Sequence, residues 1–261
     1  MMLEVRDVHK TYPKAGTWFG SGRQSILRGV SFGIPSEGTV GLVGESGSGK
    51  STLARLVLGL EQPDSGTVRM EGLPVVRWRK RYPGRMNVVF QDYTTSVNPG
   101  WTVETIIREP LAVLRRIGQE SPDAFRRIPE LLERVGLSAD LASRLPHELS
   151  GGQLQRVCIA RAIATRPRFL VFDEAVSSLD VSVQAQILDL LRSLRENMTY
   201  LFIAHDLQAV TRICDNVLFL HEGTIVDQAA GNNLESVRHE HARALLDAVV
   251  LFRSRWHAEH T

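Results

Sequence analysis

The sequence predicts an α/β fold in which an antiparallel β-layer precedes the core and an α-helical subdomain is inserted into it. Three observations predict this arrangement. A glycine-rich loop near residue 44 joins a short apolar strand to a helix, helical periodicity without strands runs from 102 to about 166, and strands alternating with helices return from residue 169. The 261 residues, 43% hydrophobic and 23% charged, suit one large α/β domain with an insertion.

The glycine-rich loop fits the pattern G-x-x-x-x-G-K-[ST] of a phosphate-binding P-loop, with a predicted strand at 39–43 and a predicted helix at 52–60 on its two sides. Glycines bring backbone N–H groups close to an anion, and the helix N-terminus adds its unpaired N–H groups. Lys50 is expected on the outer phosphates of a nucleoside triphosphate and the Ser51 hydroxyl on Mg²⁺. The core is therefore predicted to be a P-loop NTPase (RecA-like) core. The predicted nucleotide-binding residues of the loop are Gly44, Glu45, Ser46, Gly47, Ser48, Gly49, Lys50, Ser51 and Thr52.

The other elements follow in order along the chain. Strands are predicted at 3–8, 26–34, 67–70, 86–90, 169–173, 199–204, 216–220 and 224–227, and the Gly- and Ser-rich segment 14–24 with Trp18-Phe19 predicts a loop. Helices are predicted at 102–114, 123–135, 154–164, 183–194, 207–213 and 234–250, and Pro110 is expected to bend or end the first of these. The expected parts are 1–91 and 167–233 for the nucleotide-binding core, 92–166 for the helical subdomain and 234–261 for a tail.

Composition restricts the class of protein. The net charge of +2 gives no argument for nucleic acid, and the basic run 77–81 is expected to be a solvated loop rather than an RNA or membrane contact. No apolar run reaches the roughly 18 residues of a membrane helix, and no signal peptide is visible, so a cytoplasmic protein is expected. Cys158 and Cys214 lack metal-ligand spacing and are expected to be reduced, buried thiols.

Four polar elements each follow a predicted strand: Gly44, Gln91, Asp173-Glu174 and His205. In open parallel sheets that edge binds ligands, so one site is predicted. Asp173 ends four apolar residues, as in a Walker B strand, and its carboxylate is expected to hold Mg²⁺. Glu174 is expected to orient and polarise the attacking water, although a charge at a helix N-terminus would explain it too.

The two remaining strand-end residues each allow more than one role. His205 fits a γ-phosphate donor, although a histidine after a buried strand is more often a satisfied core residue. Gln91 offers both a donor and an acceptor, so it suits Mg²⁺ or the water, and a movable loop there would sense the γ-phosphate.

A second phosphate-binding element lies at Leu149, Ser150, Gly151, Gly152 and Gln153, directly before a predicted helix. It is either an ordinary capped helix or an anion site. An anion site without a lysine, on a different subdomain, makes sense if it serves a nucleotide held by another subunit.

Leu-Ser-Gly-Gly-Gln between a P-loop and Phe-Asp-Glu closely resembles the ATP-binding cassette (ABC) family, over essentially the whole chain. The resemblance implies that Tyr12 is the aromatic residue that stacks on adenine, although position alone favours packing at a sheet edge. It implies that Gln91 belongs to the Q-loop, that Ser178, Leu179 and Asp180 form the D-loop, and that His205 is the switch histidine. It also implies a head-to-tail dimer with ATP and Mg²⁺ between one subunit's P-loop and the other's signature, closed by ATP and reopened by hydrolysis.

Residues 88–92 and 96–99, the Trp18-Phe19 insertion, residues 181–186 and the segment 239–250 are similar to oligopeptide, dipeptide and nickel importers. This resemblance implies a paralogous ATPase subunit as heterodimer partner, two integral membrane permease subunits, an extracytoplasmic substrate-binding protein and a place at the cytoplasmic face of the membrane. The chain departs from these importers in lacking the cysteine cluster of some members and in Ala175-Val176-Ser177-Ser178, where Pro-Thr-Ser-Ala is commoner.

Two other functions are compatible with a P-loop. A soluble, ribosome- or DNA-associated ABC ATPase usually carries two cassettes or a long coiled-coil insertion, and neither is visible. A switch that binds nucleotide without turnover is disfavoured by Glu174 and His205. The sequence therefore favours the energising ATPase of an importer and leaves the cargo open between peptide, nickel and metal chelate.

Overall fold

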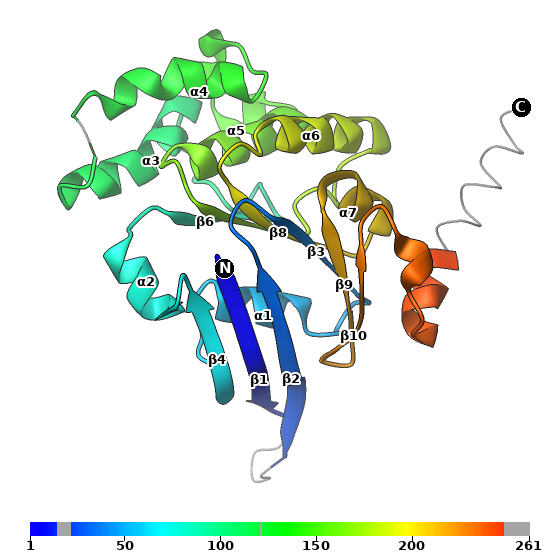
Figure 1. Ribbon diagram of the computed structural model, residues 1–261. Helices are drawn as coiled ribbons and strands as arrows, with labels where there is room; N and C mark the ends of the chain where they lie inside the picture. Colours follow the sequence, from blue (N-terminus) through cyan, green and yellow to red (C-terminus); the bar gives the residue numbers. More distant parts are fainter. Residues whose placement is uncertain (15–21, 121, 248–261) are drawn as a thin grey trace, which may run out of the picture. The chain divides into compact units, whose positions relative to one another are not determined.

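A computed structural model describes residues 1–14, 22–120 and 122–247 of the chain (Figure 1). The chain divides into two compact units, which are described separately: unit 1 comprises Met1–Val75 and Leu201–Thr261, and unit 2 comprises Val76–Tyr200. The Trp18-Phe19 insertion lies outside the described residues. The sequence-based boundaries at 91, 166 and 233 stay a prediction.

Unit 1 contains the predicted antiparallel β-layer. Its strands are β1 (Leu3–Pro13), β2 (Arg23–Ile34), β4 (Ser65–Met70) and β5 (Leu73–Pro74), in the order β2-β1-β4-β5. Val5 on β1 is paired with Phe32 on β2 and with Val68 on β4, and all three side chains are buried. The alternating apolar and polar residues of β1 therefore correspond to a sheet with one buried, apolar face.

Unit 1 also holds the strand that precedes the P-loop, β3 (Thr39–Val43), which is buried over its full length. It is parallel to β9 (Asn216–His221), which forms a hairpin with β10 (Thr224–Ala230). On its other side β3 neighbours β8 (Thr199–Ala204), and the division between the units falls within β8. The helices α1 (Lys50–Val57) and α7 (Leu207–Ile213) complete this part of unit 1.

Unit 2 pairs two parallel strands, β6 (Met86–Phe90) and β7 (Phe169–Asp173), and between them in sequence lie the predicted helices. These are α3 (Val103–Arg116), α4 (Ile128–Arg134) and α5 (Gly151–Ile163), joined by 3₁₀ turns at Pro122–Arg127, Ala139–Ser143 and Pro146–Glu148. The helix predicted at 123–135 is therefore α-helical only from Ile128, because its first residues form the 3₁₀ turn. The helix α6 (Val181–Ser193) follows β7. Pro110 lies inside α3, which continues past it to Arg116, so it does not end the helix.

The basic run 77–81 is not the expected loop. It lies in the helix α2 (Val75–Arg81), and its tryptophan, Trp78, is completely buried beside Tyr82, with ring centroids 5.3 Å apart. The spacings of three and four residues place Val75, Trp78 and Tyr82 on one face of a helix. The sequence interpretation followed the basic residues between them and therefore predicted a loop.

The tail also differs from its prediction. Leu234–Ser236 forms a 3₁₀ turn, Val237 is extended, and residues 240–247 are helical; the rest of the predicted helix lies outside the described residues. The Asp227 carboxylate holds the backbone just before this helix, because its Oδ2 accepts hydrogen bonds from the N–H groups of Arg238 (2.7 Å) and His239 (2.8 Å). The helix therefore begins after these residues.

Both cysteines are free and buried, as the sequence predicted. Burial raises the pKa of Cys158 to about 12, so its reactive thiolate form is suppressed. Across the described part of the chain, no helix combines the length and the apolar character needed to cross a membrane.

Replacing Trp78 by alanine should destabilise the protein strongly, because a fully buried ring is lost from the face of α2. Large-to-small changes of this kind cost about 3–5 kcal/mol of unfolding free energy. Urea denaturation followed by circular dichroism measures the change, and Arg77→Ala, on the exposed face of α2, is the matched control. Equal losses for the two variants would contradict the burial of Trp78.

Candidate nucleotide-binding site

The P-loop in unit 1 holds its lysine in a defined position. Lys50 is the first residue of α1 and is 4% exposed, and its Nζ donates hydrogen bonds to the carbonyl oxygens of Gly44 and Glu45, both at 2.8 Å. The N–H of Ser48 also donates to the Glu45 carbonyl, at 3.2 Å. A buried ammonium at a helix N-terminus, wrapped by its own loop, is a cation pre-positioned for a phosphate.

Two glycines of the loop have no room for a side chain. A Cβ on Gly44 would lie 2.2 Å from the carbonyl oxygen of Leu220, and a Cβ on Gly49 would lie 2.8 Å from Cδ2 of Leu27. Gly49 also has a φ of +111°, which an L residue rarely adopts. Within the described residues the buried Oγ of Ser48 has no hydrogen-bond partner, and such a group suits a ligand oxygen. The loop therefore has the form of an anion cradle.

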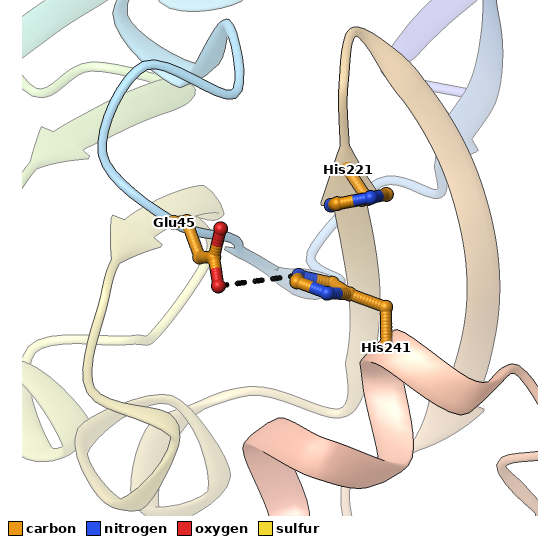
Figure 2. Close-up of side chains that lie close together, drawn as sticks. All are labelled: Glu45, His221 and His241. Atoms are coloured by element: carbon orange, nitrogen blue, oxygen red, sulfur yellow. Dashed lines mark ion pairs between the residues drawn. The ribbon is translucent and has the colours of Figure 1, made fainter.

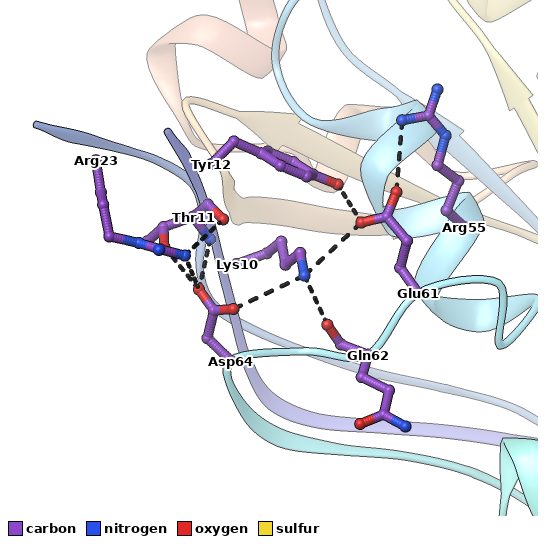
Figure 3. Close-up of polar contacts among 8 residues, drawn as sticks. All are labelled: Lys10, Thr11, Tyr12, Arg23, Arg55, Glu61, Gln62 and Asp64. Carbon is purple, nitrogen blue, oxygen red and sulfur yellow. Dashed lines mark hydrogen bonds and ion pairs between the residues drawn. The ribbon is translucent and has the colours of Figure 1, made fainter. Parts of the chain in front are cut away.

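Tyr12, the predicted adenine-stacking residue, is anchored by its hydroxyl (Figure 3). The hydroxyl donates to Glu61, whose carboxylate lies 3.6 Å from Arg55 of α1, and Lys10 Nζ lies 5.4 Å from the Tyr12 ring centroid. Burial raises the pKa of Tyr12 and the bond to Glu61 raises it further, whereas hydrogen bonds with Thr52 and Arg55 lower it. Tyr12 thus belongs to the surroundings of the P-loop helix, while its stacking on adenine stays a prediction.

Asp64 fixes the strand that carries Tyr12. Its Oδ2 accepts hydrogen bonds from the N–H and the hydroxyl of Thr11, both at 2.7 Å (Figure 3). These bonds hold the pKa of Asp64 below its usual value, and Lys10 and Arg23 act in the same direction.

In unit 2 the paired strands bring two predicted site residues to one edge. The register of β6 and β7 pairs Phe90 with Asp173, so Gln91 and Glu174 each follow directly at the same end of the two strands. The sequence expected Gln91 and Asp173-Glu174 at a common carboxyl edge, and the register bears this out within unit 2.

Glu174 has a strained backbone. Its φ is +52°, and its carbonyl oxygen accepts hydrogen bonds from the N–H (3.1 Å) and the hydroxyl (2.8 Å) of Ser177. A left-handed conformation costs a non-glycine residue about 1–2 kcal/mol, and such strain collects where an active site needs a particular orientation.

Gln155 is a residue that the sequence reasoning missed. It lies on α5 with no exposed surface, and its Nε2 donates a 2.7 Å hydrogen bond to the carbonyl oxygen of Ala175, the residue after Glu174. The available signal was spacing, because Gln155 lies three, four and seven residues before the apolar Cys158, Ile159 and Ala162 and so shares their face of the helix. It ties the helix of the signature segment to the loop that carries Glu174.

The signature segment forms the start of α5, which begins at Gly151 rather than at the predicted residue 154. Ser150 is the N-cap, and its Oγ accepts from the N–H of Gln153 (3.2 Å) while its own N–H donates to Gln153 Oε1 (2.9 Å). A Cβ on Gly151 would lie 2.7 Å from the Tyr93 hydroxyl, and one on Gly152 would lie 2.6 Å from Val183. The helix start is therefore a rigid, capped terminus, and its role as an anion site stays a prediction.

The remaining predicted residues lie at element ends. Ser178, Leu179 and Asp180 lead into α6, with Asp180 at its N-cap, and the next residue, Val181, is 82% exposed. His205 is exposed and directly follows β8 in unit 1. The catalytic roles given to Glu174 and His205, and the Mg²⁺ roles given to Ser51, Gln91 and Asp173, stay predictions.

Gly44→Ala should abolish nucleotide binding, because the added Cβ would force the loop away from Leu220. Gly47→Ala should be milder, since no atom lies within 4 Å of its Cβ position and the cost is the strain of φ +81°, about 1–2 kcal/mol. Titration with a fluorescent ATP analogue measures both affinities. If Gly44→Ala bound as well as Gly47→Ala, the steric role of Gly44 would be wrong.

Comparison with known proteins was made with the sequence and with the structure. The family model described as ABC transporter matches residues 27–177. The chain is 43% identical over 253 residues to the metal-staphylopine import system ATP-binding protein CntF of Staphylococcus aureus, covering 96% of this chain and 100% of that protein. It is 44% identical over 256 residues to the nickel import ATP-binding protein NikE of Rhodospirillum rubrum, covering 95% and 91%.

Two solved structures are similar as well. A dimeric structure of a post-hydrolysis state of the ATP-binding cassette MJ0796, bound to ADP and Pi, has a TM-score of 0.76 at 28% identity and covers 88% of this chain and 98% of that one. cbiO1 of Clostridium perfringens, part of the ABC transporter complex cbiONQ, has a TM-score of 0.75 at 25% identity and covers 90% of each chain. The predicted P-loop NTPase fold is thereby confirmed. This protein belongs to the ABC transporter family, as one of its ATP-binding, ATP-hydrolysing chains.

Proposed function

We propose that this chain is the ATPase subunit of a bacterial importer whose cargo is nickel or a metal chelate. One observation carries the proposal: over 95–96% of the chain, 43–44% of residues are identical to proteins named as ATP-binding components of metal-staphylopine and nickel import. The sequence also left peptide uptake open, but neither of these two relatives is named as a peptide importer. The proposed location is the cytoplasmic face of the membrane, bound to permease subunits.

The proposed chemistry assigns one step to each residue. Lys50 binds the outer phosphates, Glu174 accepts a hydrogen bond from the attacking water, and His205 donates to the γ-phosphate. The Ser51 hydroxyl, the Gln91 amide oxygen and the Asp173 carboxylate are hard oxygen donors of the kind that Mg²⁺ prefers. That ion, when bound, neutralises charge on the phosphates. Two features support fixed orientations in this chemistry: the hydrogen bond from the Tyr12 hydroxyl to Glu61, and the strained backbone of Glu174.

The proposed working form is a head-to-tail dimer with a paralogous ATPase subunit. The capped start of α5, with Ser150 exposed, supports a signature that contacts the partner's nucleotide. Val181, which is 82% exposed, directly follows the D-loop, so the partner would cover its side chain in such a dimer. A cassette of similar structure is described as a dimer.

The proposed contact with membrane subunits lies on unit 2. Two neighbouring grooves, of about 590 and 410 Å³, share Glu109 and Arg161. Arg161 of α5 donates to the carbonyl of Ser96 (2.7 Å) and to Glu109 of α3 (2.5 Å). Val113 and Ile117, each 53% exposed, line the larger groove. These links join the segment after Gln91 to the signature helix, which supports transmission of nucleotide state to an apolar segment of a permease.

Glu174→Gln should stop ATP hydrolysis while ATP is still bound, because the amide keeps the shape of the carboxylate but loses the negative charge that polarises the water. We expect turnover to fall by at least about 100-fold, as for loss of a general base. Phosphate release measures turnover, and size-exclusion chromatography with ATP measures closure of the dimer. Near-normal hydrolysis would remove Glu174 from its proposed role.

Placing a charge in the larger groove tests the transport function itself. Ile117→Glu should weaken co-purification with two membrane-embedded subunits and leave ATP binding unchanged, because the groove is distinct from the P-loop. Gln119→Ala, an exposed change close by, is the control. The measurement is affinity purification of the tagged chain from its own membranes with mass spectrometry of the bound proteins. Recovery of ribosomal or DNA-bound proteins in place of permeases would contradict the proposal.

A further inference from the structure

Three side chains with metal-ligand chemistry meet beside the P-loop in unit 1 (Figure 2). Glu45 comes from the P-loop, His221 from the end of β9 and His241 from the tail helix 240–247. Their candidate ligand atoms all lie within 4.8 Å of one another. Nothing in the proposed reaction uses either histidine, so the cluster needs its own explanation.

The backbone brings these residues together by two separate constraints. The parallel register of β3 and β9 pairs Val43 with Phe219, and the close approach of Gly44 to the Leu220 carbonyl continues that register. Glu45 and His221 therefore leave neighbouring strands at the same edge. His241 reaches them because Asp227 of β10 binds the backbone N–H groups of residues 238 and 239 and fixes the start of the tail helix.

The contacts within the cluster leave a nitrogen atom unsatisfied. The imidazole rings of His221 and His241 are stacked with centroids 3.7 Å apart, an arrangement that uses no ring nitrogen. Nε2 of His241 is buried and lacks a hydrogen-bond partner within the described residues; the Glu45 carboxylate lies 3.9 Å from it, beyond hydrogen-bond length. A buried nitrogen lone pair or N–H group without a partner is costly, and a metal ion would remove that cost.

We propose that Glu45, His221 and His241 bind one late first-row transition-metal ion, of the Ni²⁺ or Zn²⁺ class, and that this ion fastens the tail helix to the P-loop. Imidazole and carboxylate ligands suit these ions, whereas Mg²⁺ prefers oxygen ligands alone. Tetrahedral ligands with bonds of about 2.0–2.1 Å lie roughly 3.3 Å apart, so side-chain rotation must shorten the distances between ligand atoms by up to about 1.5 Å. Glu45 is 62% exposed at its side chain, which leaves a path for the ion and a position for water.

The ion would act on nucleotide binding through charge. Glu45 places a carboxylate in the loop that binds the phosphates, and the same residue's carbonyl holds Lys50 and Ser48. A divalent cation on that carboxylate replaces a negative charge by a net positive one, which attracts ATP more strongly. Coupling of this kind is reciprocal and typically changes an affinity by 5-fold or more.

Metal binding to the untagged full-length chain tests the site directly. Isothermal titration with Ni²⁺ and with Zn²⁺, in a buffer with excess Mg²⁺, should show one site in the wild type. Loss of a ligand should weaken it by at least about 10-fold in His221→Ala and in His241→Ala. The control is His9→Ala, a partly exposed histidine of the same unit outside the cluster, which should bind like the wild type. Equal binding by all four proteins, or no binding by the wild type, overturns the site.

Three further measurements separate the site from simple misfolding and test its effect. In metal-free buffer His221→Ala and His241→Ala should remain folded, with thermal unfolding lowered only by the loss of the stacked ring contact, and their ATP affinity should match the wild type. With free metal held constant by a chelator, the wild type should bind ATP about 5-fold more tightly than it does in metal-free buffer. His241→Ala should bind ATP equally well with and without the metal. Hydrogen exchange over 240–247 should slow on metal addition in the wild type alone. If the metal changed neither the hydrogen exchange over 240–247 nor the ATP affinity of the wild type, the proposed attachment of the tail helix to the P-loop would be wrong.

Discussion

The close approach of the P-loop backbone to β9 is the constraint on which the site in unit 1 depends. A Cβ on Gly44 would lie 2.2 Å from the carbonyl oxygen of Leu220, so the chain can leave β3 in this direction only without a side chain at that position. The approach sets where the loop turns, and the turn directs the carbonyls of Gly44 and Glu45 toward the Lys50 ammonium. One steric condition therefore positions both the cation and the side chain of Glu45.

Unit 2 depends on a different kind of interaction, in which polar side chains of α5 donate hydrogen bonds to backbone carbonyl groups of other segments. Gln155 donates to the Ala175 carbonyl and Arg161 donates to the Ser96 carbonyl. Breaking either bond would leave a partly or fully buried carbonyl unpaired, at a cost of about 1–3 kcal/mol. The helix that begins at the signature is thus tied to the loop after Glu174 at one position and to the segment after Gln91 at another.

Much of this arrangement could be predicted from sequence because it depends on local patterns. The P-loop, the strand before Asp173 and the cap at Ser150 each combine a periodicity with a motif, and parallel strands that end at Phe90 and Asp173 then place Gln91 and Glu174 at one edge. The helix at Val75–Arg81 was missed because its apolar face has few residues, and Trp78 is buried only through tertiary packing. The 3₁₀ turn and delayed helix of the tail depend on Asp227, a residue of β10 that no local window of the tail contains.

The difference between features set by local sequence patterns and features set by tertiary contacts also explains why the Glu45–His221–His241 cluster could not be found from sequence. Metal-ligand patterns are recognised by short spacings, whereas these residues lie far apart in the chain and are assembled by strand register and by the anchoring of the tail. Glu45 also has two separable functions, because its carbonyl belongs to the Lys50 cradle and its carboxylate to the cluster. A side-chain substitution at Glu45 would keep the backbone carbonyl but would change the charge within the loop itself, whereas the two histidines reach the P-loop only through their side chains. This separation lets metal binding be studied at His221 and His241 without disturbing the loop that binds phosphate.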